Sequence, residues 1–156
     1  MIQIYTCAAT IPKTCGVRML MIEPDRSEFT MAAAVFRAYP PFRDSGKEDI
    51  LVRCESITEA EQLLNKSPYD LIVLGAEDSK APGIREVRRM TDAPLLAMAW
   101  PGQAAAKART CGEPRMAVAE KKMFISSPLF NALDALREYI LGKGVSPYNL
   151  LQEGSF

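Results

Sequence analysis

Short apolar segments alternate five times with stretches whose apolar residues have helical spacing, and this alternation limits the possible folds most. The apolar segments span residues 18–24, 50–54, 70–75, 93–100 and 123–127. Near-continuous apolar runs of this length are typical of strands that are covered on both faces of a sheet. Parallel strands need crossover helices between them, so the alternation predicts an α/β fold with a doubly wound parallel sheet.

The segments between the strands predict helices on both faces of that sheet. Apolar residues at i, i+3, i+4 and i+7 form one stripe after the first strand, and Ser56 with Glu59 forms a capping box after the second. The stripe consists of Phe29, Ala32, Ala33 and Phe36. Five strands and their helices predict the flavodoxin-like arrangement, with strand order 2-1-3-4-5. Residues 38–49, with paired prolines, predict a loop.

A length of 156 residues fits one domain, which we place at residues 18–141. Residues 1–17 are an N-terminal extension that forms either an additional edge strand or no regular structure. Residues 142–156 are a C-terminal tail, either a linker or a segment that docks on a neighbour.

The charge balance gives no electrostatic reason for binding nucleic acid or a membrane. Lysine plus arginine and aspartate plus glutamate number 19 each, and the net charge is zero. No apolar run approaches the roughly 20 residues of a membrane helix, and the N-terminus lacks the pattern of a secretory signal. A cytoplasmic protein is therefore expected.

Cysteine and histidine usage argues against a metal centre and against several kinds of catalysis. The chain has no histidine, and its four cysteines are scattered. A structural zinc site would require all four cysteines to converge, and the usual Ser-His and Cys-His nucleophiles are excluded. We expect idle thiols and no cofactor.

In doubly wound sheets, ligands bind beyond the carboxyl ends of the strands, and this rule selects the candidate site. The residues that follow the predicted strands there are Glu23, Pro24, Asp25, Gly75, Ala76, Glu77, Asp78, Ala99, Trp100, Ser126 and Ser127.

Four motifs in order resemble the receiver domain of two-component response regulators. The segment YDLIVLGAEDSKAPG, residues 69–83, matches the family's YDLIxLDxxxPxxxG pattern without a gap. LMIEPD at residues 20–25 resembles the first strand with its acidic cluster. APLLAMAW and MFISSPLF resemble the fourth strand and the fifth strand with its turn. The resemblance covers residues 18–141.

The resemblance implies self-phosphorylation of an aspartate, a reaction for which this sequence lacks the groups. The family needs an acceptor carboxylate, acidic groups that hold Mg²⁺, a hydroxyl and a lysine. At the family's acceptor position this sequence has Gly75. At the position of the hydroxyl it has Ala99, and at the position of the lysine it has Ser127. Of the acidic pair, Glu23 remains beside Pro24. The resemblance therefore implies a pseudo-receiver that is not an enzyme and acts independently of phosphorylation.

Two other interpretations concern ligands at the same edge. In the first, Glu23, Asp25 and Glu77 could gather a divalent cation, although Mg²⁺ requires near-ideal octahedral geometry. Alternatively, Glu77 is a solvated loop residue and Asp25 caps the first helix.

The second interpretation is a flavin- or nucleotide-binding protein of the same fold. It would need a phosphate loop rich in glycine, serine or threonine, whereas the first loop here is acidic.

The resemblance also implies a protein partner, or self-association as a homodimer. The usual contact face of the family involves its fourth helix, fifth strand and fifth helix. Trp100 and Phe124 lie near that face on the alignment, and we interpret them as candidates for a partner surface, with ordinary packing as the other interpretation.

Overall fold

Six parallel strands form one sheet in the computed structural model, which describes residues 2–7, 9–12, 15–75, 83–104, 106–107, 114–121 and 127–141. The spatial order is β1-β3-β2-β4-β5-β6. The strands are β1 (Ile2–Thr6), β2 (Arg18–Ile22), β3 (Asp49–Cys54), β4 (Leu71–Leu74), β5 (Leu95–Ala99) and β6 (Met116–Glu120). The doubly wound parallel sheet is confirmed, and the predicted order 2-1-3-4-5 corresponds to β3-β2-β4-β5-β6.

The prediction of five strands is wrong, because the N-terminal extension adds a sixth. Strand β1 pairs in parallel with β3, with Ile2 opposite Asp49 and Thr6 opposite Arg53. Ile2 is buried in the core beside β3. Of the two interpretations of residues 1–17, the edge strand therefore holds for residues 2–6. One buried isoleucine on an otherwise half-exposed strand is too weak a pattern to predict this from sequence.

The last strand lies earlier in the chain than predicted. Strand β5 pairs along its length with β6, from Leu95 opposite Met116 to Ala99 opposite Glu120. Of the segment predicted as this strand, residues 123–126 lie outside the described residues, and Ser127 is the first residue of a helix. Strand β6 is a half-buried edge strand with two alanines, so it lacks the strong apolar signal of a central strand.

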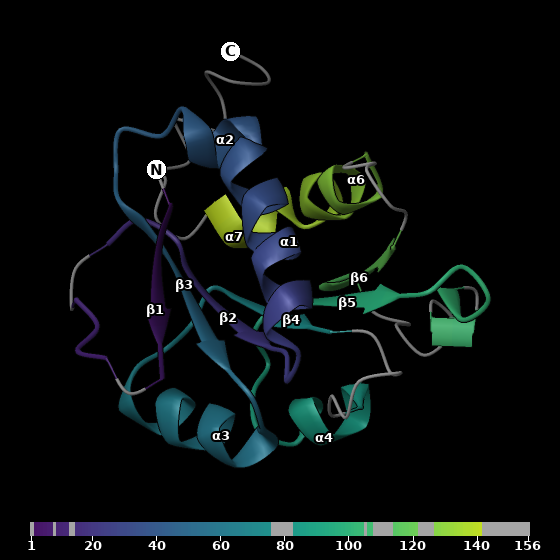
Figure 1. Cartoon of the computed structure of the whole chain (residues 1–156), viewed down its shortest axis with the longest axis horizontal. Helices are drawn as coiled ribbons and strands as arrows, with labels where there is room; N and C mark the ends of the chain where they lie inside the picture. The colour runs from purple at the N-terminus through teal and green to yellow at the C-terminus, as the bar shows by residue number, and fades with distance from the viewer. Residues whose placement is uncertain are drawn as a thin grey trace.

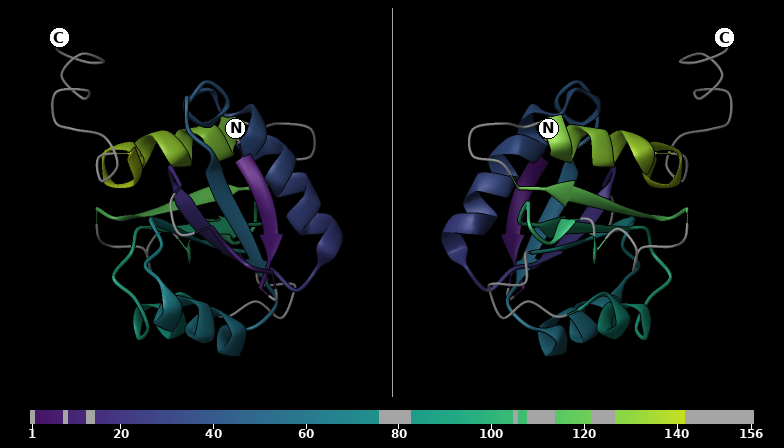
Figure 2. Two further views of the ribbon diagram at one scale, coloured as in Figure 1. Left: turned by 90° about the vertical axis from the view of Figure 1, so that its left-hand side faces the viewer. Right: turned by 90° about the vertical axis from the view of Figure 1, so that its right-hand side faces the viewer.

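The helices cover both faces of the sheet, as Figures 1 and 2 show. On one face lie α1 (Arg26–Ala38), α2 (Pro40–Arg43), α6 (Ser127–Ala135) and α7 (Arg137–Leu141). On the other lie α3 (Ile57–Lys66) and α4 (Ile84–Arg88). The predicted stripe of α1 is buried on the first face. Among the described residues, no helix is long and apolar enough to cross a membrane.

Side-chain caps begin two of the helices where the sequence predicts them. The Asp25 carboxylate accepts hydrogen bonds from the backbone N–H groups of Ser27 and Glu28, at 2.8 and 3.1 Å, and so caps α1. Ser56 Oγ accepts from the N–H of Glu59 at 3.2 Å, which caps α3. The loop predicted for residues 38–49 contains the short helix α2, which begins at Pro40 because the fixed φ of proline suits a first helical turn.

Tyr39 joins the end of α1 to α6 through a partly buried hydrogen bond. Its side chain is 3% exposed, and its hydroxyl donates to Asp134 Oδ1 at 2.5 Å. Burial, and then this hydrogen bond to a carboxylate, raise the pKa of Tyr39 well above its ordinary value. Folding therefore favours the neutral phenol.

A raised pKa in the folded state makes stability depend on pH in one direction. The contribution of Tyr39 should be complete below about pH 10, where the unfolded phenol is neutral, and should decline as the pH rises above that value. Tyr39→Phe should lower the free energy of unfolding by about 1 kcal/mol at pH 7. Urea denaturation between pH 7 and 11 measures the difference between wild type and variant. A difference that grows with pH would contradict this account.

Candidate functional site

The carboxyl ends of the central strands bring the predicted site residues to one edge of the sheet. Glu23 follows β2, Gly75 follows β4, and Ala99 is the last residue of β5. These strands are neighbours in the sheet, and all run in the same direction. The structure therefore places Glu23, Pro24, Gly75 and Ala99 together, as the sequence predicts.

The carboxylate of Glu23 occupies the space in which a side chain at position 75 would begin. A Cβ atom built on Gly75 would lie 2.3 Å from Glu23 Oε1 and 2.7 Å from its Cδ. Glu23 is 1% exposed, and its Oε2 accepts a hydrogen bond from the N–H of Asp25 at 3.1 Å. Only glycine at position 75 leaves room for the Glu23 carboxylate in this position.

Backbone hydrogen bonds hold both residues of this pair in place. The N–H of Gly75 donates to the carbonyl of Ile22 at 3.1 Å, and the N–H of Glu23 donates to the carbonyl of Cys54 at 2.9 Å. The guanidinium of Arg53 donates to the carbonyls of Glu23 and Pro24, at 3.2 and 2.9 Å. The loop after β2 is thus fixed from the neighbouring strand, and Glu23 stays directed at Gly75.

Asp25 serves the helix rather than the site. Its Oδ1 accepts hydrogen bonds from the hydroxyl and the N–H of Ser27 and from the N–H of Glu28. The bond from the Ser27 hydroxyl, followed by those of the backbone, lowers the pKa of Asp25. The predicted cation site also needs Glu77, which lies outside the described residues. Within the described ranges, no three acidic, cysteine or histidine side chains gather closely enough for a metal ion.

The basic residue that directly follows the last strand is Lys121, which the sequence patterns do not single out. Ser127, predicted to hold this position, is an exposed residue that begins α6. Lys121 comes directly after β6, and its N–H donates to the carbonyl of Ala99 at 2.7 Å. The correction follows from the shifted strand: once β6 is placed at residues 116–120, the residue beyond its carboxyl end is a lysine.

Lys121 is paired with two residues of this neighbourhood. Its ammonium forms an ion pair with Glu28 of α1 and lies 4.7 Å from the centroid of the Trp100 ring. The side chain of Lys121 is 12% exposed and that of Glu28 26%. Trp100, which follows β5, is thereby half-buried on the α1 side of the sheet. Phe124, the other predicted surface residue, lies outside the described residues.

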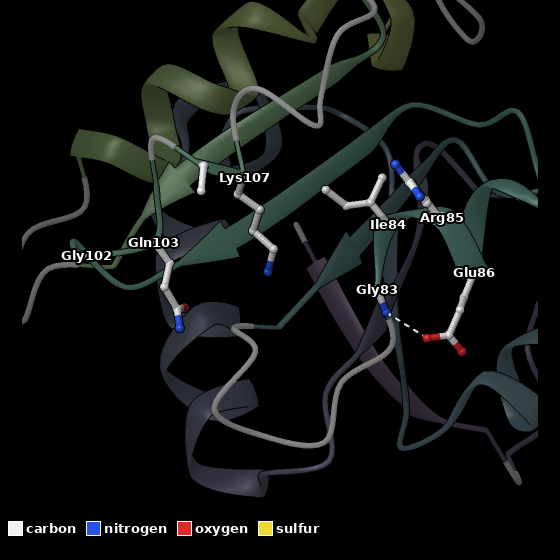
Figure 3. A pocket seen from close by; sticks show the side chains of 8 residues that line it. Gly83, Ile84, Arg85, Glu86, Gly102, Gln103 and Lys107 are labelled. Carbon is white, nitrogen blue, oxygen red and sulfur yellow. Dashed lines mark hydrogen bonds between the residues drawn. The ribbon is translucent and has the colours of Figure 1, made fainter.

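A separate hollow of about 440 Å³ lies between the start of α4 and a second set of residues, Gly102, Gln103, Ala106 and Lys107 (Figure 3). Lys107 extends into this space, and its ammonium donates to the carbonyl of Met98 at 3.2 Å. Glu86 turns back toward the start of α4 and accepts from the N–H of Gly83 at 3.2 Å. Both polar groups are engaged with the protein itself.

Comparison with known proteins identifies the fold. No protein-family model matches the sequence, and no curated protein matches it. Among solved structures, a protein named as a response regulator from Chloroflexus aurantiacus J-10-fl has a TM-score of 0.56 at 19% identity. The match covers 78% of this chain and 98% of that one. This chain has the receiver fold.

Two further receiver structures agree. The response regulator receiver protein of Sinorhizobium medicae WSM419 has a TM-score of 0.55 at 17% identity, covering 80% of this chain and 97% of that one. The signal receiver domain of a DNA binding response regulator from Colwellia psychrerythraea 34H has a TM-score of 0.54 at 17% identity, covering 78% and 98%. The predicted receiver fold is confirmed.

The apolar pattern of the sequence predicts which residues lie at the ends of the central strands, but it does not single out Lys121. Glu23 and Gly75 directly follow strands with strong apolar patterns, and Ala99 is the last residue of such a strand, so the sequence predicts where they lie. Lys121 follows the weakly patterned β6. The signal that could have identified it is the short apolar stretch at residues 116–119 followed by charged residues, which is how an edge strand ends.

Proposed function

We propose that this chain is a non-enzymatic signalling and protein-interaction module with the receiver fold, and that it acts without phosphorylation. The observation that carries the proposal is the position of Glu23. Its carboxylate fills the space where the acceptor side chain would begin, against a glycine that has no side chain.

The chemistry of the site supports an inactive phosphorylation pocket. Phosphoryl transfer requires an accessible carboxylate nucleophile and positioned groups that stabilise the transferred phosphoryl. Position 75 has no nucleophile and Ala99 has no hydroxyl. Glu23 is a carboxylate, but it is buried and accepts a hydrogen bond from Asp25. Lys121 is paired with Glu28 and stacked on Trp100.

If phosphorylation does not act on this module, something else must shift the equilibrium between its conformational states. A ligand or partner shifts a conformational equilibrium only by its differential affinity for the two states. We therefore propose that a protein partner, or a second copy of this chain, fills this role. Trp100, together with Phe124, is our candidate for the contact surface, and the cytoplasm is the proposed location.

The flavin or nucleotide interpretation has less support. The loop after β2 would have to receive a phosphate, and it presents the carboxylates of Glu23 and Asp25, both of which are held in place by hydrogen bonds. Two carboxylates at this loop repel an anionic phosphate. We do not propose this function.

Exposure to phosphoryl donors tests the proposal directly. The chain is incubated with acetyl phosphate and Mg²⁺, and separately with beryllofluoride and Mg²⁺. Its intact mass, its Trp100 fluorescence and its sedimentation are then measured. We expect an unchanged mass, no fluorescence response and an unchanged oligomeric state.

The Glu23→Gln variant serves as the matched control for this experiment. Stable phosphorylation of the wild type that disappears in Glu23→Gln would show that Glu23 replaces the acceptor, and would overturn the proposal. Stable phosphorylation at any other carboxylate would overturn it as well.

A further inference from the structure

A small apolar cavity adjoins the Lys121–Trp100 contact, outside the pocket of Glu23 and Gly75. Its volume is about 250 Å³, and it lies between α1, the ends of β5 and β6, and the start of α6. Seven of the ten described residues that line it are apolar, so its interior suits an apolar group. Ala32, Met98, Ala119 and Leu129 are buried in its walls.

The rim of this cavity exposes apolar surface. Met31 of α1 lines the cavity and is 53% exposed. Within the described part of the chain, it is the only large apolar side chain that is so exposed. A cavity with apolar walls and an apolar rim is the usual form of a small-molecule site, in which a few polar groups fix the orientation of the ligand.

The charged groups of the cavity favour a cation. The described lining carries two carboxylates, Glu28 and Glu120, and one ammonium, Lys121. The ring of Trp100 adds a face that attracts cations. An anionic ligand would approach the carboxylate of Glu28, whereas an ammonium would be attracted by this carboxylate and by the ring.

The protein's own Lys121 shows how a cation sits at this place. Its ammonium is held between the carboxylate of Glu28 and the face of Trp100. We propose that the cavity binds a small alkylammonium compound. Its aliphatic chain lies among the apolar walls, and its ammonium replaces that of Lys121 at Glu28 and Trp100.

The size of the cavity limits the ligand to a short amine. Pockets for drug-sized ligands measure about 300–1,000 Å³, and this cavity lies below that range. The ligand must also compete with Lys121, whose partly exposed ion pair and cation–π contact are each of modest strength. Binding of a short amine is therefore expected to be weak in the wild type and tighter where Lys121 cannot compete.

Trp100 is the only tryptophan of the chain, so its fluorescence reports directly on this site. The full chain is titrated with hexylammonium, with hexanoate and hexanol as controls of matched chain length at constant ionic strength. We expect a saturable change with hexylammonium and none with hexanoate. The absence of saturation with hexylammonium, or equal binding of hexanoate or hexanol, would overturn the proposal.

Two variants separate specific binding from nonspecific adsorption. Lys121→Met keeps the aliphatic stem and removes the competing ammonium, so hexylammonium should bind about five-fold more tightly. Glu28→Gln removes the carboxylate, so binding should weaken about five-fold. Circular dichroism establishes that both variants are folded. Weaker binding by Lys121→Met, or unchanged binding by Glu28→Gln, would contradict the exchange of ammonium groups.

A lysine side chain of a partner protein has the same chemistry as a free alkylamine. The titration is therefore repeated with Nα-acetyl-lysine methylamide, which presents the side chain on a blocked backbone. Tighter binding of hexylammonium supports a free amine as the ligand. Tighter binding of the blocked lysine would assign the site to a protein partner and overturn the small-molecule proposal.

Discussion

Replacing Gly75 with alanine is expected to lower the free energy of unfolding by about 2 kcal/mol, although the change adds a single methyl group. The new Cβ would lie 2.3 Å from Glu23 Oε1, far inside van der Waals contact. The end of a glutamate side chain is flexible, but Glu23 is 1% exposed and must lose its buried position to move. Urea denaturation measures the loss of stability.

Gly46→Ala is the matched control for this variant. Beyond its two chain neighbours, no heavy atom lies within 4 Å of a Cβ built on Gly46, so the same change should alter stability little there. Equal losses for Gly75→Ala and Gly46→Ala would show that steric conflict with Glu23 is not the cause.

A double-mutant cycle with Glu23→Ala then isolates the contact. The three nearest heavy atoms to the new methyl group all belong to Glu23. Removing that side chain should make Gly75→Ala nearly neutral, with a coupling of at least about 1 kcal/mol between the two positions. Additive effects would contradict the account. The same geometry implies that aspartate at position 75 fits only after the Glu23 carboxylate has moved from its present position.

Asp49→Ala is expected to have a comparably large effect, a loss of about 3 kcal/mol of unfolding free energy. Asp49 is 2% exposed at the start of β3. Its carboxylate accepts the N–H of Val17 at 2.8 Å and the hydroxyl of Ser45 at 2.9 Å. Alanine would deprive both donors of this acceptor, and Val17 is itself buried. Thermal and urea denaturation measure the change.

Asp92→Ala and Asp49→Asn provide the comparison. Asp92 is exposed, so its replacement should cost little. Asparagine at position 49 keeps an oxygen that accepts the N–H of Val17. Asp49→Asn should therefore lower the free energy of unfolding by less than half as much as Asp49→Ala does. A loss for Asp49→Asn as large as that for Asp49→Ala would show that the charge, rather than the hydrogen bond to Val17, matters.

The strength of local patterns explains how much of the fold could be predicted. Strands β2, β3, β4 and β5 are nearly continuous apolar runs because helices cover both of their faces, so each was evident from sequence. The edge strands β1 and β6 are half-exposed and therefore lack a continuous run of buried apolar residues. Their pairing is decided by the neighbouring strand, which sequence patterns do not contain.

The candidate site divides in the same way. The sequence alone determined that position 75 lacks a nucleophile and position 99 lacks a hydroxyl, because these are properties of residue type. Tertiary structure decided that Glu23 fills the space beside Gly75. It also decided that Lys121, rather than Ser127, directly follows the last strand and pairs with Glu28. Both facts depend on distances between segments that are remote in sequence, which only the packing of strands and helices sets.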